Sequence, residues 1–172
     1  MECACREATS SKSPWGKWSW ERIHSPADSF YCSVPSRSLL DQWKTLLVGD
    51  RFVVRKTHSK VPARGDIVVH IHPVDRKDTF VKRVVALPGD RVRIVNKQLF
   101  INGSAVSEPY VQRKTSYMDS YCDNFPSEAS VTLYPPAREM LANNVVNGEV
   151  VVPPHRYFVL GDNRDSSLDS RY

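Results

Sequence analysis

From Thr45 to the C-terminus, the chain consists largely of short β-branched runs separated by turn-forming pairs such as Gly-Asp. Runs of this kind favour strands, and the turn residues between them keep each strand short. The expected strands are Arg51–Arg55, Asp66–Ile71, Thr79–Ala86, Arg91–Val95, Gln98–Ile101, Glu149–Val152 and Tyr157–Leu160. The sequence therefore predicts a mainly β fold.

Turn signals between consecutive runs indicate how the strands pair. Asn96-Lys97 is a two-residue hairpin signal, Asn102-Gly103 is a stronger one, and Leu87–Asp90 contains Pro-Gly between two further runs. Tight turns of this kind join antiparallel neighbours, whereas parallel strands need a long crossover connection. The sheet is therefore predicted to be antiparallel.

The residue composition divides the chain into two parts. All four tryptophans and three of the four cysteines precede Thr45, in a segment without sustained periodicity. Residues 1–44 are interpreted as an atypical, poorly ordered segment and residues 45–172 as one domain. Within the domain, residues 108–148 look like a loop-rich insertion, with one possible helix at Ala137–Asn144.

Composition also excludes several classes of protein. The chain has 172 residues and a net charge of +5, which is well below the dense basic stripe of a dedicated nucleic-acid binder. No apolar run approaches the roughly 20 residues of a membrane-spanning helix. The four cysteines form no C-x-x-C pair, so no metal site is predicted from them. No cofactor is expected either, and the chain is expected to be a monomer.

Lys82 stands out because it shares one strand face with Phe80, Val84 and Ala86. Desolvation among apolar side chains disfavours the charged ammonium and lowers the pKa of a lysine, so its neutral amine can act as a base. A base of this kind can activate a serine nucleophile. The alternative is a lysine whose stem packs while its ammonium reaches solvent, and the strand alone favours this alternative.

The final twelve residues, Gly161–Tyr172, form a second candidate region. They follow a predicted strand and contain many turn-forming and oppositely charged residues. They could form a solvated loop held by surface ion pairs, or a rigid loop that places a serine beside Lys82. Composition does not separate these two interpretations.

The residues of four segments, and the order of these segments along the chain, resemble those of the type I signal peptidases, the bacterial leader peptidases that use a Ser-Lys pair. The four segments are Leu47–Val54 (LVGDRFVV), Arg64–Val69 (RGDIVV), Val81–Asp90 (VKRVVALPGD), and Val159–Ser167 (VLGDNRDSS) followed by Asp169–Arg171 (DSR). The resemblance runs from about Thr45 to Tyr172. It implies a barrel-like antiparallel signal-peptidase fold and a serine endopeptidase that removes signal peptides from exported preproteins.

The resemblance also implies roles for individual residues. Lys82 would be the general base, and Ser167 would donate a hydrogen bond to its amine and orient it. Asp169 and Arg171 would form an ion pair that holds the loop, while Gly161–Asn163 would shape the turn beside the base. The substrate would bind as an extended strand along the sheet, a case of strand addition.

The nucleophile segment departs from the family pattern, which is PSxSMxPTL just before LVGD. Val34–Ser38 (VPSRS) matches its first half, but three extra residues precede Thr45, and Met and Pro are missing. A three-residue insertion makes Ser38 the nucleophile and Ser36 the hydroxyl of the oxyanion hole. An alignment without a gap instead puts Asp41 at the position of the nucleophile. Its carboxylate would raise the pKa of Lys82, keep the amine protonated and so prevent the reaction.

The resemblance further implies a cell-membrane location, with the active domain on the extracytoplasmic side. Family members carry a membrane helix before the nucleophile and a further strand after the segment matching Gly161–Tyr172; this chain is expected to lack both. Its partners would be the signal peptides of exported preproteins and the membrane, and not nucleic acid.

Other interpretations remain open. A catalytically inactive copy could act as a peptide-binding module. A self-cleaving repressor of the same clan is disfavoured because no helix-turn-helix pattern precedes the β region, and a small RNA-binding barrel ranks last. His70 and His72 are expected to be an exposed pair and not metal ligands, and Lys56, Lys60 and Arg64 a solvated basic tip that could contact anionic lipid.

Overall fold

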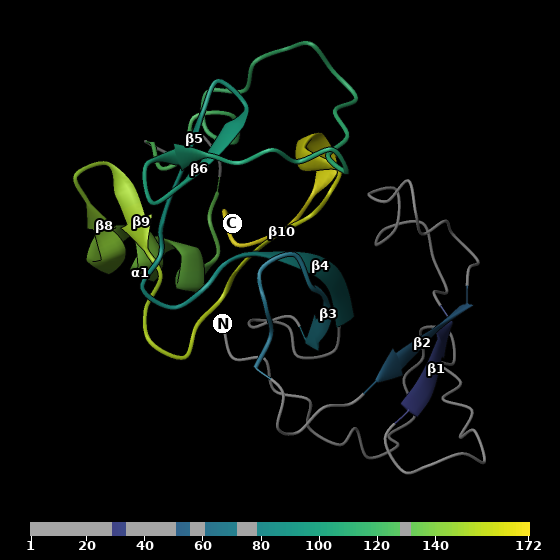
Figure 1. Cartoon of the computed structure of the whole chain (residues 1–172). Helices are drawn as coiled ribbons and strands as arrows, with labels where there is room; N and C mark the ends of the chain where they lie inside the picture. Colours follow the sequence, from purple (N-terminus) through teal and green to yellow (C-terminus); the bar gives the residue numbers. More distant parts are fainter. Residues whose placement is uncertain (1–28, 34–50, 56–60, 72–78, 128–131) are drawn as a thin grey trace.

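The computed structural model describes residues 29–33, 51–55, 61–71, 79–127 and 132–172. Most of its regular structure is β (Figure 1). The strands are β1 (Ser29–Ser33), β2 (Arg51–Arg55), β3 (Ile67–Ile71), β4 (Thr79–Ala86), β5 (Arg91–Val95), β6 (Gln98–Ile101), β7 (Ser104–Ala105), β8 (Val145–Val146), β9 (Glu149–Val151) and β10 (Phe158–Leu160). The helices are α1 (Pro135–Asn144) and the short 3₁₀ helix η1 (Arg164–Ser166).

The strands form three antiparallel sheets with the orders β1-β2, β10-β4-β3 and β7-β6-β5-β9-β8. The expectation of an antiparallel, mainly β fold is confirmed, but the described strands do not close into a barrel. The turn Leu87–Asp90 separates β4 from β5, which lie in different sheets and do not pair. Backbone hydrogen bonds from Gly89 to Val152 (2.8 Å) and from Val152 to Asp90 (2.9 Å) fasten this turn to the strand end after β9.

The predicted strands agree closely with the observed ones. β2, β4, β5 and β6 have the predicted bounds, and β3, β9 and β10 differ by one residue at one end. α1 begins two residues before the predicted helix, at Pro135. Proline fits the first helical turn because its φ is already helical and its missing N–H has no partner to lose there.

Three short strands were missing from the prediction. β1 falls in the segment expected to be poorly ordered, and its five residues pair with β2. β7 and β8 each contain only two residues, too few to show an alternating pattern. β8 nevertheless has a signal, since Asn147 and Gly148 adopt positive φ (52° and 74°) and form the tight turn into β9.

The expected Asn96-Lys97 hairpin turn is present, with positive φ at both residues (47° and 70°). This turn joins β5 to β6 in the predicted register, with Val95 opposite Gln98. Two backbone N–H groups of the turn donate hydrogen bonds to the insertion: Asn96 N–H donates to the side-chain Oδ1 of Asn124 (3.0 Å) and Lys97 N–H to the Asp123 carbonyl (2.9 Å). The insertion therefore packs on the tip of this hairpin.

The main hydrophobic core lies between the two larger sheets, α1 and the insertion. Its buried residues are Val85, Ala86, Val92, Ile94, Leu99, Ile101, Tyr121, Phe125, Leu133, Ala137, Val150, Val152, Phe158 and Leu160. The Tyr121 ring meets the Phe125 ring edge-on, with centroids 5.7 Å apart. Two aromatic side chains of the insertion, Tyr121 and Phe125, are thus part of the core of the domain.

Two isoleucines in strands offer a matched test of this core. Ile94 on β5 is 4% exposed and Ile67 on β3 is 49% exposed. Ile94→Ala should lower the free energy of unfolding by about 2–5 kcal/mol, because it leaves a cavity in the core. Ile67→Ala should cost about 1 kcal/mol or less. Chemical denaturation at pH 7 measures both, and equal losses would contradict this assignment of the core.

Candidate active site

Lys82 lies in β4, the central strand of the three-stranded sheet, opposite Val68 of β3. The residue is only 1% exposed. Its Nζ lies over the Phe80 ring, 5.2 Å from the ring centroid. The apolar strand face predicted from the sequence is therefore formed, and the alternative of an ammonium that reaches solvent is excluded.

Burial lowers the pKa of Lys82 from 10.5 to about 8. Asp169 opposes this shift, Arg171 adds to it, and Asp162 opposes it more weakly. Desolvation prevails because the surrounding cation and carboxylates act in opposite directions. A substantial fraction of neutral amine is thus present near pH 8, as a general base requires.

The loop after β10 contains the expected ion pair between Asp169 and Arg171. Arg171 Nε donates to Asp169 Oδ1 and Nη2 to Oδ2, both at 2.8 Å. Both side chains are buried, with exposures of 0% and 1%. Although burial opposes ionisation of both groups, the pair holds the pKa of Asp169 below and that of Arg171 above its ordinary value.

The remaining hydrogen bonds of the pair hold the chain around it. Arg171 donates from Nη2 to the Arg164 carbonyl (2.9 Å) and from Nη1 to the Cys122 carbonyl (3.3 Å). Gly161 N–H donates to Asp169 Oδ2 (3.2 Å). The ion pair therefore connects both ends of the loop with the insertion.

The turn Gly161–Asn163 is attached to β4 by the residue next to Lys82. Arg83 donates from Nε and Nη2 to the two carboxylate oxygens of Asp162, at 3.0 and 2.7 Å. On the other side, Gln112 N–H donates to the Asp162 carbonyl (2.8 Å) and forms a parallel bridge with Asn163. The turn is therefore fixed between β4 and the insertion, beside the candidate base.

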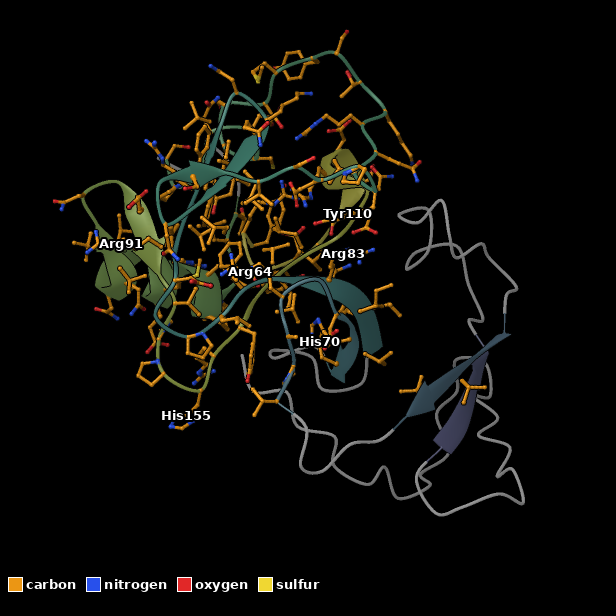
Figure 2. All side chains as sticks on the ribbon, viewed as in Figure 1. Arg64, His70, Arg83, Arg91, Tyr110 and His155 are labelled. Carbon is orange, nitrogen blue, oxygen red and sulfur yellow. The ribbon has the colours of Figure 1, made fainter. Side chains whose placement is uncertain are left out.

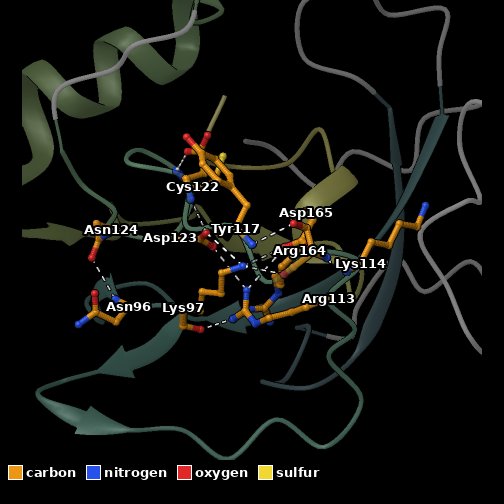
Figure 3. Close-up of polar contacts among 12 residues, drawn as sticks. Asn96, Lys97, Arg113, Lys114, Tyr117, Cys122, Asp123, Asn124, Arg164 and Asp165 are labelled. Carbon is orange, nitrogen blue, oxygen red and sulfur yellow. Dashed lines mark hydrogen bonds and ion pairs between the residues drawn. The ribbon is translucent and has the colours of Figure 1, made fainter.

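A cluster of four charged side chains holds η1 (Figure 3). Lys97 Nζ lies 3.5 Å from Asp123 Oδ2 and 4.0 Å from Asp165 Oδ1, and Arg113 contacts the same two carboxylates at 3.5 and 3.9 Å. Asp165 Oδ2 also accepts hydrogen bonds from the backbone N–H groups of Lys114 (2.6 Å) and Thr115 (3.0 Å). Sequence reasoning did not find this cluster, since its members come from four separate segments.

Ser167, directly after η1, is buried, but it does not form the expected hydrogen bond with the Lys82 amine. Its Oγ is buried and has no hydrogen-bond partner in the described part of the chain. Ser167 lies just beyond η1 in extended conformation (φ −121°, ψ 122°), so its orientation follows the backbone of the loop. Its role in orienting the base stays a prediction.

The other predicted site residues have mixed outcomes. Ser36, Ser38 and Asp41 lie outside the described residues, as do His72, Lys56 and Lys60. His70 is buried (6% exposed) and not exposed as expected, because it faces the Phe80 ring across the sheet, with centroids 6.1 Å apart. Arg64 is not simply solvated, because its Nη2 pairs with Asp90 at 2.7 Å.

A cavity of about 360 Å³ lies between α1, β9 and the C-terminal residues. Phe80 and Asp169 line it, together with apolar groups such as Met140, Val152 and Leu168. Lys82 is not among the lining residues, so the cavity approaches the base only through its neighbours. Within the described ranges, no group of three or more His, Cys, Asp or Glu side chains could hold a metal ion.

Comparison with known proteins assigns the chain to a family. The family model described as "Signal peptidase, peptidase S26" matches residues 30–172. The chain therefore belongs to the signal peptidase family, peptidase S26. The match includes every candidate site residue described above.

Several curated relatives are similar to this chain. It is 38% identical to signal peptidase I of Pseudomonas fluorescens over 113 residues, which are 64% of this chain and 39% of the relative. It is 33% identical to the probable signal peptidase I-2 of Synechocystis over 147 residues (81% and 53%). It is 41% identical to signal peptidase I U of Bacillus subtilis over 108 residues (63% and 47%). The chain thus spans about half of these relatives or less.

Among solved structures, a signal peptidase I from Enterococcus faecalis is 34% identical, with a TM-score of 0.48 over 66% of this chain and 86% of that one. None of the helices in the described segments combines the length and apolar character needed to cross a membrane.

Replacing Lys82 should reveal its depressed pKa as a pH-dependent stability difference. Between pH 8 and 10.5, the unfolded state binds more protons at this site than the folded state, so stability rises with pH. Lys82→Met removes this dependence. The unfolding free energy of Lys82→Met minus that of the unmodified chain should therefore be larger at pH 7 than at pH 10.5, by roughly 3 kcal/mol. Denaturant unfolding of both proteins at both pH values measures the difference, and an equal gain at both would refute the shift.

Removing one partner of the buried pair should be costly. Arg171→Met leaves the Asp169 carboxylate buried without its counter-ion and should lower the unfolding free energy by about 3–5 kcal/mol. Arg91→Met is the matched control, because the Arg91 side chain is 46% exposed and its ion pair with Glu149 is long, at 3.9 Å. This substitution should cost less than about 1 kcal/mol. Urea unfolding of the two variants checks this, and similar losses would speak against a structural role for the pair.

Proposed function

We propose that this chain is a signal peptidase I-like serine endopeptidase that cleaves signal peptides from exported preproteins. Lys82 is the general base and Ser38 the nucleophile, with Ser36 supplying a hydroxyl to the oxyanion hole. The observation that carries the proposal is the buried Lys82, whose pKa is lowered to about 8 by desolvation. Family membership supports the reaction class.

In the proposed mechanism, the neutral Lys82 amine takes the proton from the Ser38 hydroxyl, and Oγ attacks the scissile carbonyl carbon. A backbone N–H and the Ser36 hydroxyl stabilise the oxyanion of the tetrahedral intermediate. When this intermediate collapses, the Lys82 ammonium returns the proton to the leaving amine and an acyl-serine remains. Lys82 then deprotonates the water that hydrolyses the ester, which restores the free serine.

The surroundings of Lys82 support the role of a base that returns to the neutral form. Phe80 and the strands on both sides keep water away from the amine, while Asp169 and Asp162 limit the cost of protonating it during each cycle. The Asp169–Arg171 pair and the Arg83–Asp162 pair fix these carboxylates. No metal or cofactor has a step in this mechanism.

The proposed partners are the signal peptides of exported preproteins, bound as extended strands along the sheet. The proposed location is the cell membrane, with the domain on its extracytoplasmic side, and the proposed state is a monomer. These proposals rest on family membership.

The second candidate function is a catalytically inactive module that binds such peptides. The observation that favours it is the sequence between Val34 and Thr45, which departs from the family pattern and offers Asp41 as an alternative to Ser38. A carboxylate beside Lys82 would keep the amine protonated.

An acylating inhibitor separates the two candidates. The full chain is incubated with a lipopeptide inhibitor that acylates the serine of signal peptidases, and the adduct is located by mass spectrometry. We expect an adduct on Ser38 that is lost in Ser38→Ala and Lys82→Ala but retained in Asp41→Ala. Lys114→Ala is the matched control, because Lys114 is an exposed lysine outside the site. Binding without any adduct would favour the peptide-binding module.

Cleavage of a signal-peptide substrate gives the corresponding kinetic test. Lys82→Ala should lower kcat by at least 10³-fold, on the order of the loss of a catalytic base, while Lys114→Ala should leave it unchanged. In the unmodified chain, kcat/KM should fall below about pH 8, because protonated Lys82 cannot accept the serine proton. Full activity of Lys82→Ala would refute the mechanism.

A further inference from the structure

Glu108, at the start of the insertion, forms a buried ion pair with Arg164 of η1. Arg164 donates from Nη1 to Glu108 Oε2 (3.0 Å) and from Nη2 to Oε1 (2.6 Å). The two side chains are only 7% and 2% exposed. A bidentate pair of this kind fixes orientation as well as distance. The insertion therefore holds the loop side chain in one position.

Tyr110 extends this contact to β4. Its hydroxyl donates to Glu108 Oε1 (3.0 Å), and its ring lies against the Arg83 guanidinium, 4.0 Å from the ring centroid. Figure 2 shows Tyr110 and Arg83 beside each other next to the end of β10. Burial and the nearby Glu108 carboxylate raise the pKa of Tyr110 to about 12, so the hydroxyl remains a donor at neutral pH.

Both arginines in contact with these two residues also hold the turn at Gly161–Asn163. Arg164 Nε donates to the Gly161 carbonyl (3.0 Å), and Arg83 holds the Asp162 carboxylate. Gly161 in turn donates its N–H to Asp169. We call Glu108, Tyr110, Arg83 and Arg164 the turn clamp. It encloses the turn from the side of the insertion and from the side of β4.

We propose that Glu108 and Tyr110 are positioning residues: through the turn clamp they hold the turn and Asp169 against Lys82 and keep water away from its amine. The proposal rests on the proposed role of Lys82 as a base, but its central claim concerns the hydration of that amine. In the described part of the chain, Glu108 and Tyr110 contact each other, Arg164 and Arg83, and they act on Lys82 only through these arginines.

The charges that face Lys82 explain why its surroundings need such support. Asp169, Arg171 and Asp162 all come from the loop after β10, whereas β3 contributes Val68 opposite Lys82 and His70 opposite Phe80. Among the described residues, the loop thus provides the charged groups that act on the buried amine. If the turn moves outward, water enters and the desolvation that lowers the lysine pKa decreases.

The first experiment reads the ionisation of Lys82 directly in the full chain. The ¹³Cε resonances of isotope-labelled lysine are titrated by NMR, and Lys82 is assigned by the signal that Lys82→Met removes. Glu108→Gln and Tyr110→Leu should each raise the titration midpoint of Lys82 by about one pH unit, which reflects the added hydration. Tyr110→Phe keeps the ring against Arg83 and should shift the midpoint less than Tyr110→Leu.

Glu149→Gln is the matched control. Glu149 pairs with Arg91 and Arg93 on the five-stranded sheet, away from the loop, so its loss should leave the Lys82 midpoint unchanged. Tyr110→Leu serves as a second probe if Glu108→Gln does not fold. Unfolding of each variant by urea shows whether the fold is retained.

A midpoint that stays unchanged or falls in folded Glu108→Gln and Tyr110→Leu would overturn the proposal and leave the turn clamp a purely structural feature. The readout needs no peptidase activity, so it remains valid even if no acyl adduct forms on Ser38. In a chain that does cleave peptides, the same two variants should lower kcat about tenfold at pH 7, consistent with one unit in the pKa of the base. They should leave KM within about twofold, because the proposed change is in the pKa of the base and not in the binding of the peptide.

Discussion

The Asp169–Arg171 pair is the interaction on which the arrangement around Lys82 depends. Arg171 is the largest of the fully buried side chains in the described residues, and an unpaired guanidinium at this position would carry a large desolvation cost. The bidentate contact with Asp169 and the carbonyls of Arg164 and Cys122 compensate for this cost. Because these partners lie on both ends of the loop and on the insertion, satisfying one charge fixes three segments at once.

The pair also explains why a lysine with two carboxylates nearby keeps a lowered pKa. Asp169 would favour the ammonium if it stood alone, but Arg171 neutralises it, and the two influences on Lys82 have opposite signs. Burial in the middle strand then decides the outcome. A simple apolar pocket would also lower the pKa of the base but would have nothing to stabilise the ammonium that forms during each proposed cycle.

Local patterns predicted the fold well, and nonlocal contacts account for what they missed. Four strands have the predicted bounds, and Lys82 on an apolar face was identified from period-two alternation alone. The Asp169–Arg171 pair was expected only from the family resemblance. His70 was expected to be exposed, yet it faces Phe80 across the sheet. Glu108 and Arg164 lie 56 residues apart, and no pattern in the sequence links such a pair.

The insertion shows how a loop-rich region can hold the residues of a candidate site in place. Its sequence is irregular, so it suggests a tolerant surface segment. Its charged residues nevertheless contact the loop after β10. Glu108 pairs with Arg164 of that loop, and Arg113 contacts both Asp123 and the loop residue Asp165, which Lys97 also approaches. Its aromatic residues Tyr121 and Phe125 meanwhile belong to the core. Since core packing fixes the insertion and the insertion fixes the loop, the hydration of Lys82 is coupled to the stability of the whole domain.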